Sequence, residues 1–473
     1  MMNVSIEKME RETLSKVLGR TDVLALSFGT MIGWGWIMLA GHWVTQAGVL
    51  GAILAFVIGA ILCIFVGLTY AELTPALPLA GGELVFAYRG MGYKASWICA
   101  WAICFAYVGV SAWEGIAIAT AVNYVLPIPD KGYLWTIAGY DVYFSWAIVG
   151  IACAFLLSVL NHIGVKTSAI FQVMATIGLV LVGLIFLFGG ITKGSIEYAV
   201  PTFTGVSGLV AVLLMAPSMF VGFDVIPQSA EEMNIPLRQI AGVLIFSICM
   251  AAAWYILMIL GISLSAPAEI RDTASVPVAD SMAYAFGSPI WGKILIAGGI
   301  CGILTSWNGF IVGATRVIFA MARAKMLPEV FAKVHPRYKT PTAATILVGI
   351  ICCVSPLLGK NALVWFVNAS AFGTVIAYFM VSLSFVMLRK NEPGLKRPFE
   401  VKRARFVGIM AVLVSAGFIS LYLPIGPGSL QWPYEWGMIL LWILIGAVLA
   451  AIAKRSYKDI TDAEREYLMF GEE

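Results

Sequence analysis

Charge is scarce in this sequence. Only 12% of the 473 residues are Asp, Glu, Lys or Arg, whereas 60% are hydrophobic. Soluble globular domains carry about 25% charged residues, and the mean hydropathy of this chain is +0.91. Water is therefore excluded as the main solvent of the folded chain. Apolar runs of about 20 residues, enough to cross a hydrocarbon core as a helix, recur along almost its whole length.

The sequence also lacks the alternating pattern of a membrane β-barrel and any long polar insertion. Lipid offers no partner to unpaired backbone groups, so spans without that alternation must be helices. No loop between apolar runs exceeds about 25 residues, too short for a separate catalytic or binding domain. We expect an all-α polytopic membrane protein with about twelve helices, near residues 22–45, 48–74, 97–125, 143–161, 167–191, 208–230, 240–264, 290–322, 341–358, 362–388, 406–424 and 435–453.

Signatures of other functional classes are missing as well. The eight cysteines all fall inside predicted helices and show no disulfide or metal-ligand spacing. No span carries the paired catalytic residues of an intramembrane enzyme, and no filter motif of a channel is present. We therefore expect no enzyme activity, no cofactor beyond a coupling ion and no nucleic-acid partner; membrane lipid is the expected surrounding, and the oligomeric state stays open.

Basic residues are distributed unevenly between the loops. With the N-terminus inside, 24 of the 30 Lys and Arg residues lie in inside segments, and outside loops hold only Lys131, Lys193, Arg271 and Lys360. Positive charge stays preferentially in the cytoplasm. The protein is therefore expected in the inner membrane as a multi-pass protein with both termini cytoplasmic, and the net charge of +4 is a topology signal.

Two of the expected helices contain residues that disfavour a continuous helix. The first has three glycines between Gly29 and Gly35, and the sixth has two prolines, a glycine and a carboxylate between Pro217 and Pro227. The run at 290–322 also contains glycines that could interrupt it. Interrupted helices at corresponding positions of two halves indicate a transporter site at the membrane midplane, where helix ends bind the charged groups of a substrate.

Four stretches in order resemble the amino acid–polyamine–organocation (APC) superfamily of permeases. They are the glycine-rich break in the first helix; Tyr70 to Leu73 with Pro78 to Glu83 and Arg89; Phe223-Asp224 followed by Glu231, Glu232 and Pro236; and Leu388 to Lys390 followed by Arg397 to Phe399. The resemblance spans residues 14–405. It implies the five-plus-five inverted-repeat fold of neurotransmitter–sodium symporters, with two additional C-terminal helices, and alternating access around a midplane site.

The resemblance also implies a domain organisation. A cytoplasmic tail at 1–21 precedes a first repeat at 22–192 and a second at 208–390. A loop and two further helices follow at 391–453, and a cytoplasmic tail ends the chain at 454–473.

The implied function is secondary active transport of amino acids, by ion-coupled symport or exchange; a small amine or polyamine without a carboxylate is the alternative substrate. Backbone and side chains around the two breaks would hold the substrate. Trp34 departs from the small Ser or Thr that the family often has there, so its indole could act as a gate. The implied substrate residues are Thr30, Ile32, Gly33, Trp34, Gly35, Tyr107, Ser218, Phe220, Gly222, Phe223, Asn308 and Phe310.

Two coupling ions remain open. For sodium, Gly302, Thr305 and Ser306 place oxygen ligands on one helical face, and hard cations prefer oxygen. Carbonyls of Gly29 and Ile32 would complete the set, although Thr305 and Ser306 could instead bond back to their own helix.

For protons, the helix 5 lysine that serves some family members is absent from residues 175–180. That leaves two carboxylates inside predicted spans, Glu114 and Asp224. Ionisable residues in a membrane are rare and usually functional. The position of Asp224 beside the second break makes it the stronger proton candidate of the two, and the two hydroxyls at 305 and 306 favour sodium slightly over protons.

The charge asymmetry gives a topological prediction. Single cysteines placed at 130–140 or 268–280 in a cysteine-free background should react with an impermeant thiol reagent from outside the cell, and cysteines at 330–338 should not. External labelling at 330–338 would contradict the orientation.

Overall fold

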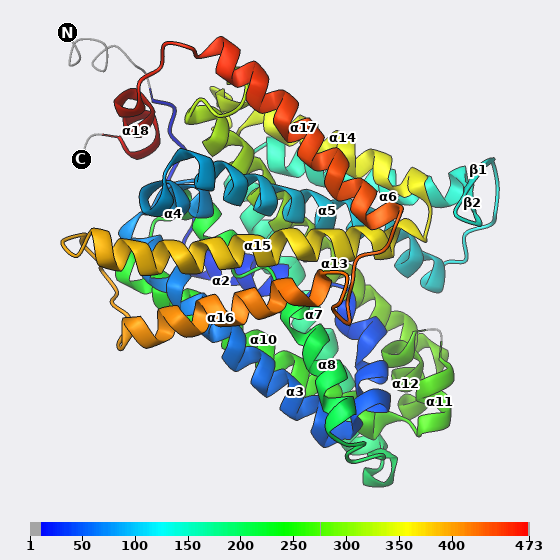
Figure 1. The fold of residues 1–473 in the computed structure, drawn as a ribbon. Helices are drawn as coiled ribbons and strands as arrows, with labels where there is room; N and C mark the ends of the chain where they lie inside the picture. Colours follow the sequence, from blue (N-terminus) through cyan, green and yellow to red (C-terminus); the bar gives the residue numbers. More distant parts are fainter. Residues whose placement is uncertain (1–10, 275, 472–473) are drawn as a thin grey trace.

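The structure is a computed structural model that describes residues 11–274 and 276–471. It is almost entirely helical (Figure 1). In chain order its α-helices are α2 (Arg20–Met31), α3 (Gly35–Ala76), α4 (Gly82–Met91), α5 (Tyr93–Val125), α6 (Phe144–His162), α7 (Val165–Lys193), α8 (Val206–Met219), α9 (Val225–Gln228), α10 (Leu237–Ser265), α11 (Ala268–Thr273), α12 (Pro277–Phe286), α13 (Pro289–Arg323), α14 (Thr342–Val354), α15 (Ala362–Asn391), α16 (Ala404–Tyr422), α17 (Tyr434–Ser456) and α18 (Asp462–Phe470).

Within these residues nine helices are long and apolar enough to cross a membrane, and α8 and the stretch at 342–358 are shorter apolar helices. The expected all-α polytopic class is confirmed, and the count of twelve crossings stays a prediction. Strands β1 (Tyr133–Ile137) and β2 (Tyr140–Tyr143) form an antiparallel hairpin that the sequence did not predict. Short 3-10 turns lie at Ile196–Tyr198, Ala230–Glu232, Glu329–Ala332 and Ser355–Leu358.

The protein has two distinct ends. Figure 1 shows both termini, α4 and α18 at one end, which we call the terminal face, and the β-hairpin, α11 and α12 at the other, which we call the hairpin face. The described N-terminal segment is tied to α18, because the Arg11 guanidinium donates to the carbonyls of Leu468 and Met469, each at 3.2 Å.

Both predicted helix breaks are confirmed. The first helix stops at Met31 and resumes at Gly35 as α3, and α8 stops at Met219 before α9 begins at Val225. Helix α3 then runs into the next span through a kink at Gly48, whose φ of 72° is left-handed. A Cβ at Gly48 would lie 2.7 Å from backbone atoms of Phe203, so only glycine permits this contact.

The possible interruption of the run at 290–322 is wrong, because α13 is continuous from Pro289 to Arg323. Its glycines instead allow close packing. A Cβ at Gly309 would overlap the Thr30 hydroxyl, and one at Gly299 would lie 2.9 Å from the Trp34 indole. Small residues commonly permit such close approach between helices in membranes. Helix α13 thereby lies directly against the first break.

Candidate substrate site

The two broken helices touch each other at their breaks. Gly222, between α8 and α9, has φ +133°, and a Cβ there would lie 2.8 Å from the backbone nitrogen of Met31. The Tyr255 hydroxyl donates to the carbonyls of both Met31 and Met219, at 2.8 and 2.9 Å. One side chain from α10 thus satisfies the carbonyls at the ends of α2 and α8, which lack partners within their own helices.

A cavity of about 970 Å³ begins at these breaks and extends to the hairpin face. Its inner end is lined by Thr30, Gly33 and Ser218, and its outer end by Ala138 and Lys360. The wall between is mainly apolar, and Lys360 is the one residue with a formal charge among the described lining residues. The apolar and aromatic lining includes Met38, Leu39, Val110, Trp113, Met219, Val221, Phe310 and Trp365.

The predicted substrate residues divide into two groups. One group lines the cavity: Thr30, Gly33, Trp34, Gly35, Ser218 and Phe310. The other is not part of the cavity lining and is buried: Ile32, Tyr107, Phe220, Gly222, Phe223 and Asn308. The structure therefore brings the first break, the end of α8 and Val221 to the cavity, and places the predicted residues of the second break behind its wall.

The Trp34 indole packs against α13. It is 4% exposed and packs on Gly299 while still lining the cavity. The ring thus occupies volume next to the first break, where a smaller side chain would leave the cavity larger.

Asp224 is fully buried and its carboxylate accepts three hydrogen bonds. The Tyr107 hydroxyl donates to it at 2.7 Å, the Tyr378 hydroxyl at 3.0 Å and the Gly222 backbone nitrogen at 2.8 Å. These bonds join α5, α15 and the second break around one carboxyl group. A buried group satisfied in this way stabilises its surroundings strongly, which accounts for the positions of Tyr107 and Gly222 behind the cavity wall.

Glu114 is also fully buried, no Lys or Arg pairs with it among the described residues, and the polar side chain beside it is the neutral Ser306. It faces the first break. A Cβ at Gly33 would lie 3.2 Å from its Oε1 and 3.1 Å from the Ser306 hydroxyl oxygen. A buried carboxyl group without a positive partner needs a proton or a cation to avoid a large desolvation cost.

The proposed sodium ligands come together around the same break. A Cβ at Gly302 would lie 3.1 Å from the carbonyl oxygen of Ile32, and one at Gly29 would lie 3.1 Å from the Cβ of Thr305. The Thr305 hydroxyl, however, donates to the Gly302 carbonyl at 3.0 Å. That contact is the bond back to its own helix that competes with ion binding.

Gln172 on α7 is a central residue that the sequence reasoning missed. Its amide nitrogen donates to the carbonyls of Ala25 and Thr305, at 3.2 and 3.1 Å, so it links α2 to α13. Its amide oxygen accepts from Asn308 at 2.8 Å, which explains why Asn308 does not reach the cavity. A glutamine inside a predicted membrane span is a sequence signal that could have identified it.

The sequence profile of the amino acid permease family matches residues 18–448. The chain belongs to this family. That match confirms the resemblance to the APC superfamily, and the permease is a multi-pass membrane protein.

Curated relatives of the permease cover nearly its full length. It is 27% identical over 468 residues to the branched-chain amino acid permease BcaP of Bacillus subtilis, with 95% of each chain covered. It is 25% identical over 471 residues to the methylthioribose transporter of the same organism, with 96% of this chain and 97% of the relative covered. It is 28% identical to the human cationic amino acid transporter 4 over 82% of this chain and 62% of that longer protein.

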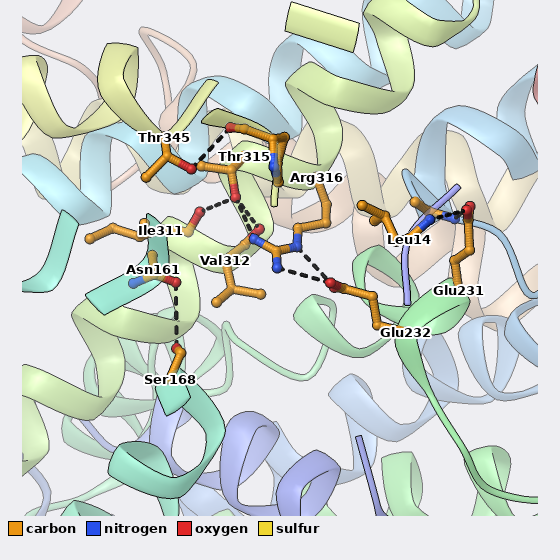
Figure 2. Close-up of polar contacts among 12 residues, drawn as sticks. Leu14, Asn161, Ser168, Glu231, Glu232, Ile311, Val312, Thr315, Arg316 and Thr345 are labelled. Atoms are coloured by element: carbon orange, nitrogen blue, oxygen red, sulfur yellow. Dashed lines mark hydrogen bonds and ion pairs between the residues drawn. The ribbon is translucent and has the colours of Figure 1, made fainter. Parts of the chain in front are cut away.

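On the terminal face of the permease, ion pairs join segments that are far apart in sequence. Figure 2 shows Arg316 of α13 directed at Glu232, which follows α9; the guanidinium nitrogens lie 2.9 and 3.0 Å from its carboxyl oxygens. The same figure shows the Leu14 backbone nitrogen donating to the neighbouring Glu231 at 3.0 Å. Arg323 also pairs with Glu231 at 2.9 Å.

Glu231 also binds the segment just before α4, because its Oε2 accepts from the Ala80 backbone nitrogen at 3.1 Å. These contacts close the terminal face. Burial by itself would raise the pKa of Glu231, but the guanidinium of Arg323, the two backbone amides and Arg11 lower it overall. The charged form is therefore the one that holds the N-terminal segment, α4 and α13 together, and this contribution is lost as the pH falls through the lowered pKa.

A second group of ion pairs lies around Glu72, near the end of α3. Arg389 donates to its Oε1 at 2.7 Å, Arg397 lies 3.1 Å from the same oxygen, and the Val401 backbone nitrogen donates to Oε2 at 2.8 Å. Charge-assisted bonds of this kind are the strong ones. The motif residues that indicated the family thus close the terminal face of the permease.

The contact between the breaks gives a stability prediction. Gly222→Ala should destabilise the purified permease, because alanine at this φ costs about 1–3 kcal/mol in backbone strain alone and its Cβ would press on Met31. Gly242→Ala is the matched control, since Gly242 faces open space on α10. Thermal unfolding in detergent should show a lower midpoint for the first variant and no loss for the second; equal midpoints would mean that the breaks do not need their close contact.

Proposed function

We propose that this permease is a secondary transporter that carries a neutral amino acid across the cytoplasmic membrane by alternating access. The observation that carries the proposal is the cavity that starts where two broken helices meet and extends to the hairpin face, while the opposite face is closed by ion pairs. A carrier needs such a site, accessible from one side at a time.

The state of the structure follows from the same observation. With the terminal face in the cytoplasm, as the distribution of basic residues favours, the cavity faces outward. Opening to the inside would require the Arg pairs of Glu72, Glu231 and Glu232 to separate or move as units. Substrate binding in the cavity would shift the balance between the two states only through contacts that differ between them.

The chemistry of the cavity favours a zwitterion with an apolar side chain. Helix α3 begins at Gly35 without a side-chain cap, so its first N–H groups are available to a carboxylate. The carbonyl at the end of α8 is bound by Tyr255, but a carbonyl oxygen has a second lone pair that can accept from an ammonium group. The remaining wall is mainly apolar, and the charge at Lys360 lies at the rim, which disfavours a cationic side chain. The branched-chain permease among the relatives fits this chemistry best.

Competition for uptake tests the substrate class. Reconstituted permease should take up radiolabelled leucine in exchange for internal leucine. Unlabelled valine and isoleucine should compete, whereas arginine, putrescine and methylthioribose, which lack either the apolar side chain or the zwitterion, should not. Competition by putrescine but not by valine would favour the small-amine alternative, and an absence of leucine exchange would reject the proposal.

For coupling we propose a proton carried by Glu114. Its carboxyl group has no positive partner among the described residues, only the neutral Ser306 hydroxyl lies beside it, and it faces the first break. Asp224, by contrast, is engaged by three donors and is assigned to hold the second break. The sodium hypothesis is weakened by two contacts: Thr305 donates to its own helix, and the Gln172 amide already joins α2 to α13, as an ion there would.

Gradients applied to proteoliposomes test the coupling. Leucine accumulation by the unaltered permease should follow an inward pH gradient, about tenfold per pH unit for one proton per substrate, and ignore a sodium gradient. Glu114→Gln should remove accumulation but keep leucine exchange. Thr305→Ala removes a proposed sodium ligand but leaves the Ser306 hydroxyl beside Glu114 intact, so it should leave pH-driven accumulation in place. If sodium drives uptake and Thr305→Ala abolishes it, the sodium site replaces the proton site.

A further inference from the structure

Glu83 differs from the other buried glutamates of the terminal face. It lies at the start of α4 and is fully buried. Whereas Glu72, Glu231 and Glu232 each pair with arginine, no Lys or Arg contacts Glu83 among the described residues. The closure of the terminal face therefore does not account for this carboxyl group.

The side chains around Glu83 are neutral or acidic. Gln228 of α9 donates its amide nitrogen to the Glu83 Oε2, and the Tyr70 hydroxyl lies beside the carboxyl group. The titratable groups that face it are Tyr70 on α3, Cys99 on α5 and Asp224 at the second break, with Tyr107 on α5 and Tyr378 on α15 behind Asp224.

Several buried polar atoms in this region have no partner within the described chain. They are Oε1 of Glu83, Oε1 of Gln228 and the hydroxyls of Ser229 and Tyr70. Buried polar groups are normally satisfied, so an unsatisfied group requires a specific reason. A proton on Glu83 supplies one, because the neutral carboxyl group is a donor as well as an acceptor.

The cluster connects the terminal face with the second break. The Tyr70 ring packs on Tyr378 and Phe223, with centroids 5.8 and 5.4 Å apart, and Tyr378 donates to Asp224. Burial raises the pKa of Glu83 well above its ordinary range, and the nearby charge of Asp224 raises it further. The neutral form of Glu83 therefore belongs to the closed terminal face.

The packing of α4 on α9 keeps water from this carboxyl group. A Cβ at Gly82 would lie 2.6 Å from the Cβ of Pro227, so the two elements are in direct contact. The Ala80 nitrogen is also bound to Glu231. Movement of α9 away from α4, as inward opening requires, would separate Gln228 from Glu83 and admit water.

We propose that Glu83 is a second proton-binding site, which releases its proton to the cytoplasm when α4 and α9 separate. The proposal rests on the proton-coupled function proposed above, and it identifies the residue from which the proton leaves on the cytoplasmic side. On hydration the carboxyl O–H bond breaks and the proton passes to water, leaving the carboxylate; closing the face again requires reprotonation or a proton arriving from the break. No oxidant, metal or second substrate takes part.

The pKa of Glu83 determines how cytoplasmic pH changes the balance between the closed and the open terminal face. Because the closed face raises the pKa of Glu83, low cytoplasmic pH favours the closed state and higher cytoplasmic pH favours release and opening. Glu114 lies beside the cavity and Glu83 lies on the terminal face, so the first should respond to external pH and the second to internal pH.

Vesicles that hold the permease with its terminal face inside separate the two responses. At fixed external pH, leucine uptake by the unaltered permease should rise as the internal pH is raised. Glu83→Gln, which imitates the neutral form, should abolish this dependence and reduce the accumulation ratio to about one, while leucine exchange at equal pH continues and confirms folding. Glu83→Asp, which restores a titratable group, should recover part of the dependence.

The matched control is Glu329→Gln, a change at a glutamate of the same face whose side chain is 62% exposed and which pairs with Lys325 at 3.5 Å; it should leave the internal pH dependence intact. An unchanged pH dependence in Glu83→Gln would overturn the proposal for Glu83 alone. A lack of pH dependence in the unaltered permease would overturn proton coupling itself.

If Glu83→Gln fails to fold, Tyr70→Phe provides the second test. Loss of the adjacent hydroxyl should shift the internal pH at which uptake is half-maximal; an unshifted midpoint would count against the site.

Discussion

The need to satisfy backbone hydrogen bonds inside lipid governs this structure. A helix can stop at membrane depth only where its free backbone groups meet protein, a cavity or a substrate. Here two helices stop at the same place, and Tyr255 binds the carbonyls that end both α2 and α8. The amides at the start of α3 have no such side-chain cap. The site thus exists because one set of helix ends is satisfied internally and the other is left for a ligand.

Glycine has two different roles around this site, and sequence alone does not separate them. At Gly222 the backbone is left-handed and touches the other break, so glycine there permits an interruption. At Gly299 and Gly309 the helix is continuous and glycine admits Trp34 and Thr30. The sequence predicted both breaks correctly because proline and clustered glycine coincide with them, but it also indicated a break in α13, where close packing was the cause.

Side-chain partners were less predictable than helices. The family motifs identified Glu72, Arg389 and Arg397, but only the folded chain shows that these residues meet, across 317 positions for Glu72 and Arg389. Of the substrate residues that the resemblance implies, those at the cavity lie in or next to the first break, at the end of α8 or, for Phe310, on α13. Phe220, Gly222 and Phe223 of the second break lie behind the wall, where Tyr107 and Tyr378 bind Asp224.

The buried carboxyl groups of this permease differ in the groups that bind them, and these partners indicate what each carboxyl group can do. Carboxylates paired with arginine on the terminal face are fixed in charge and hold a conformation. Asp224 is held by neutral donors, so it can fix the geometry of the break without an ion pair. Glu114 and Glu83 lie beside neutral side chains, Ser306 for the first and Gln228 with Tyr70 for the second, but neither has an arginine partner or the full set of donors that holds Asp224, so their protonation can change as water reaches them. Groups whose charge is fixed can define the closed state, but only groups whose charge varies can couple its opening to a proton gradient.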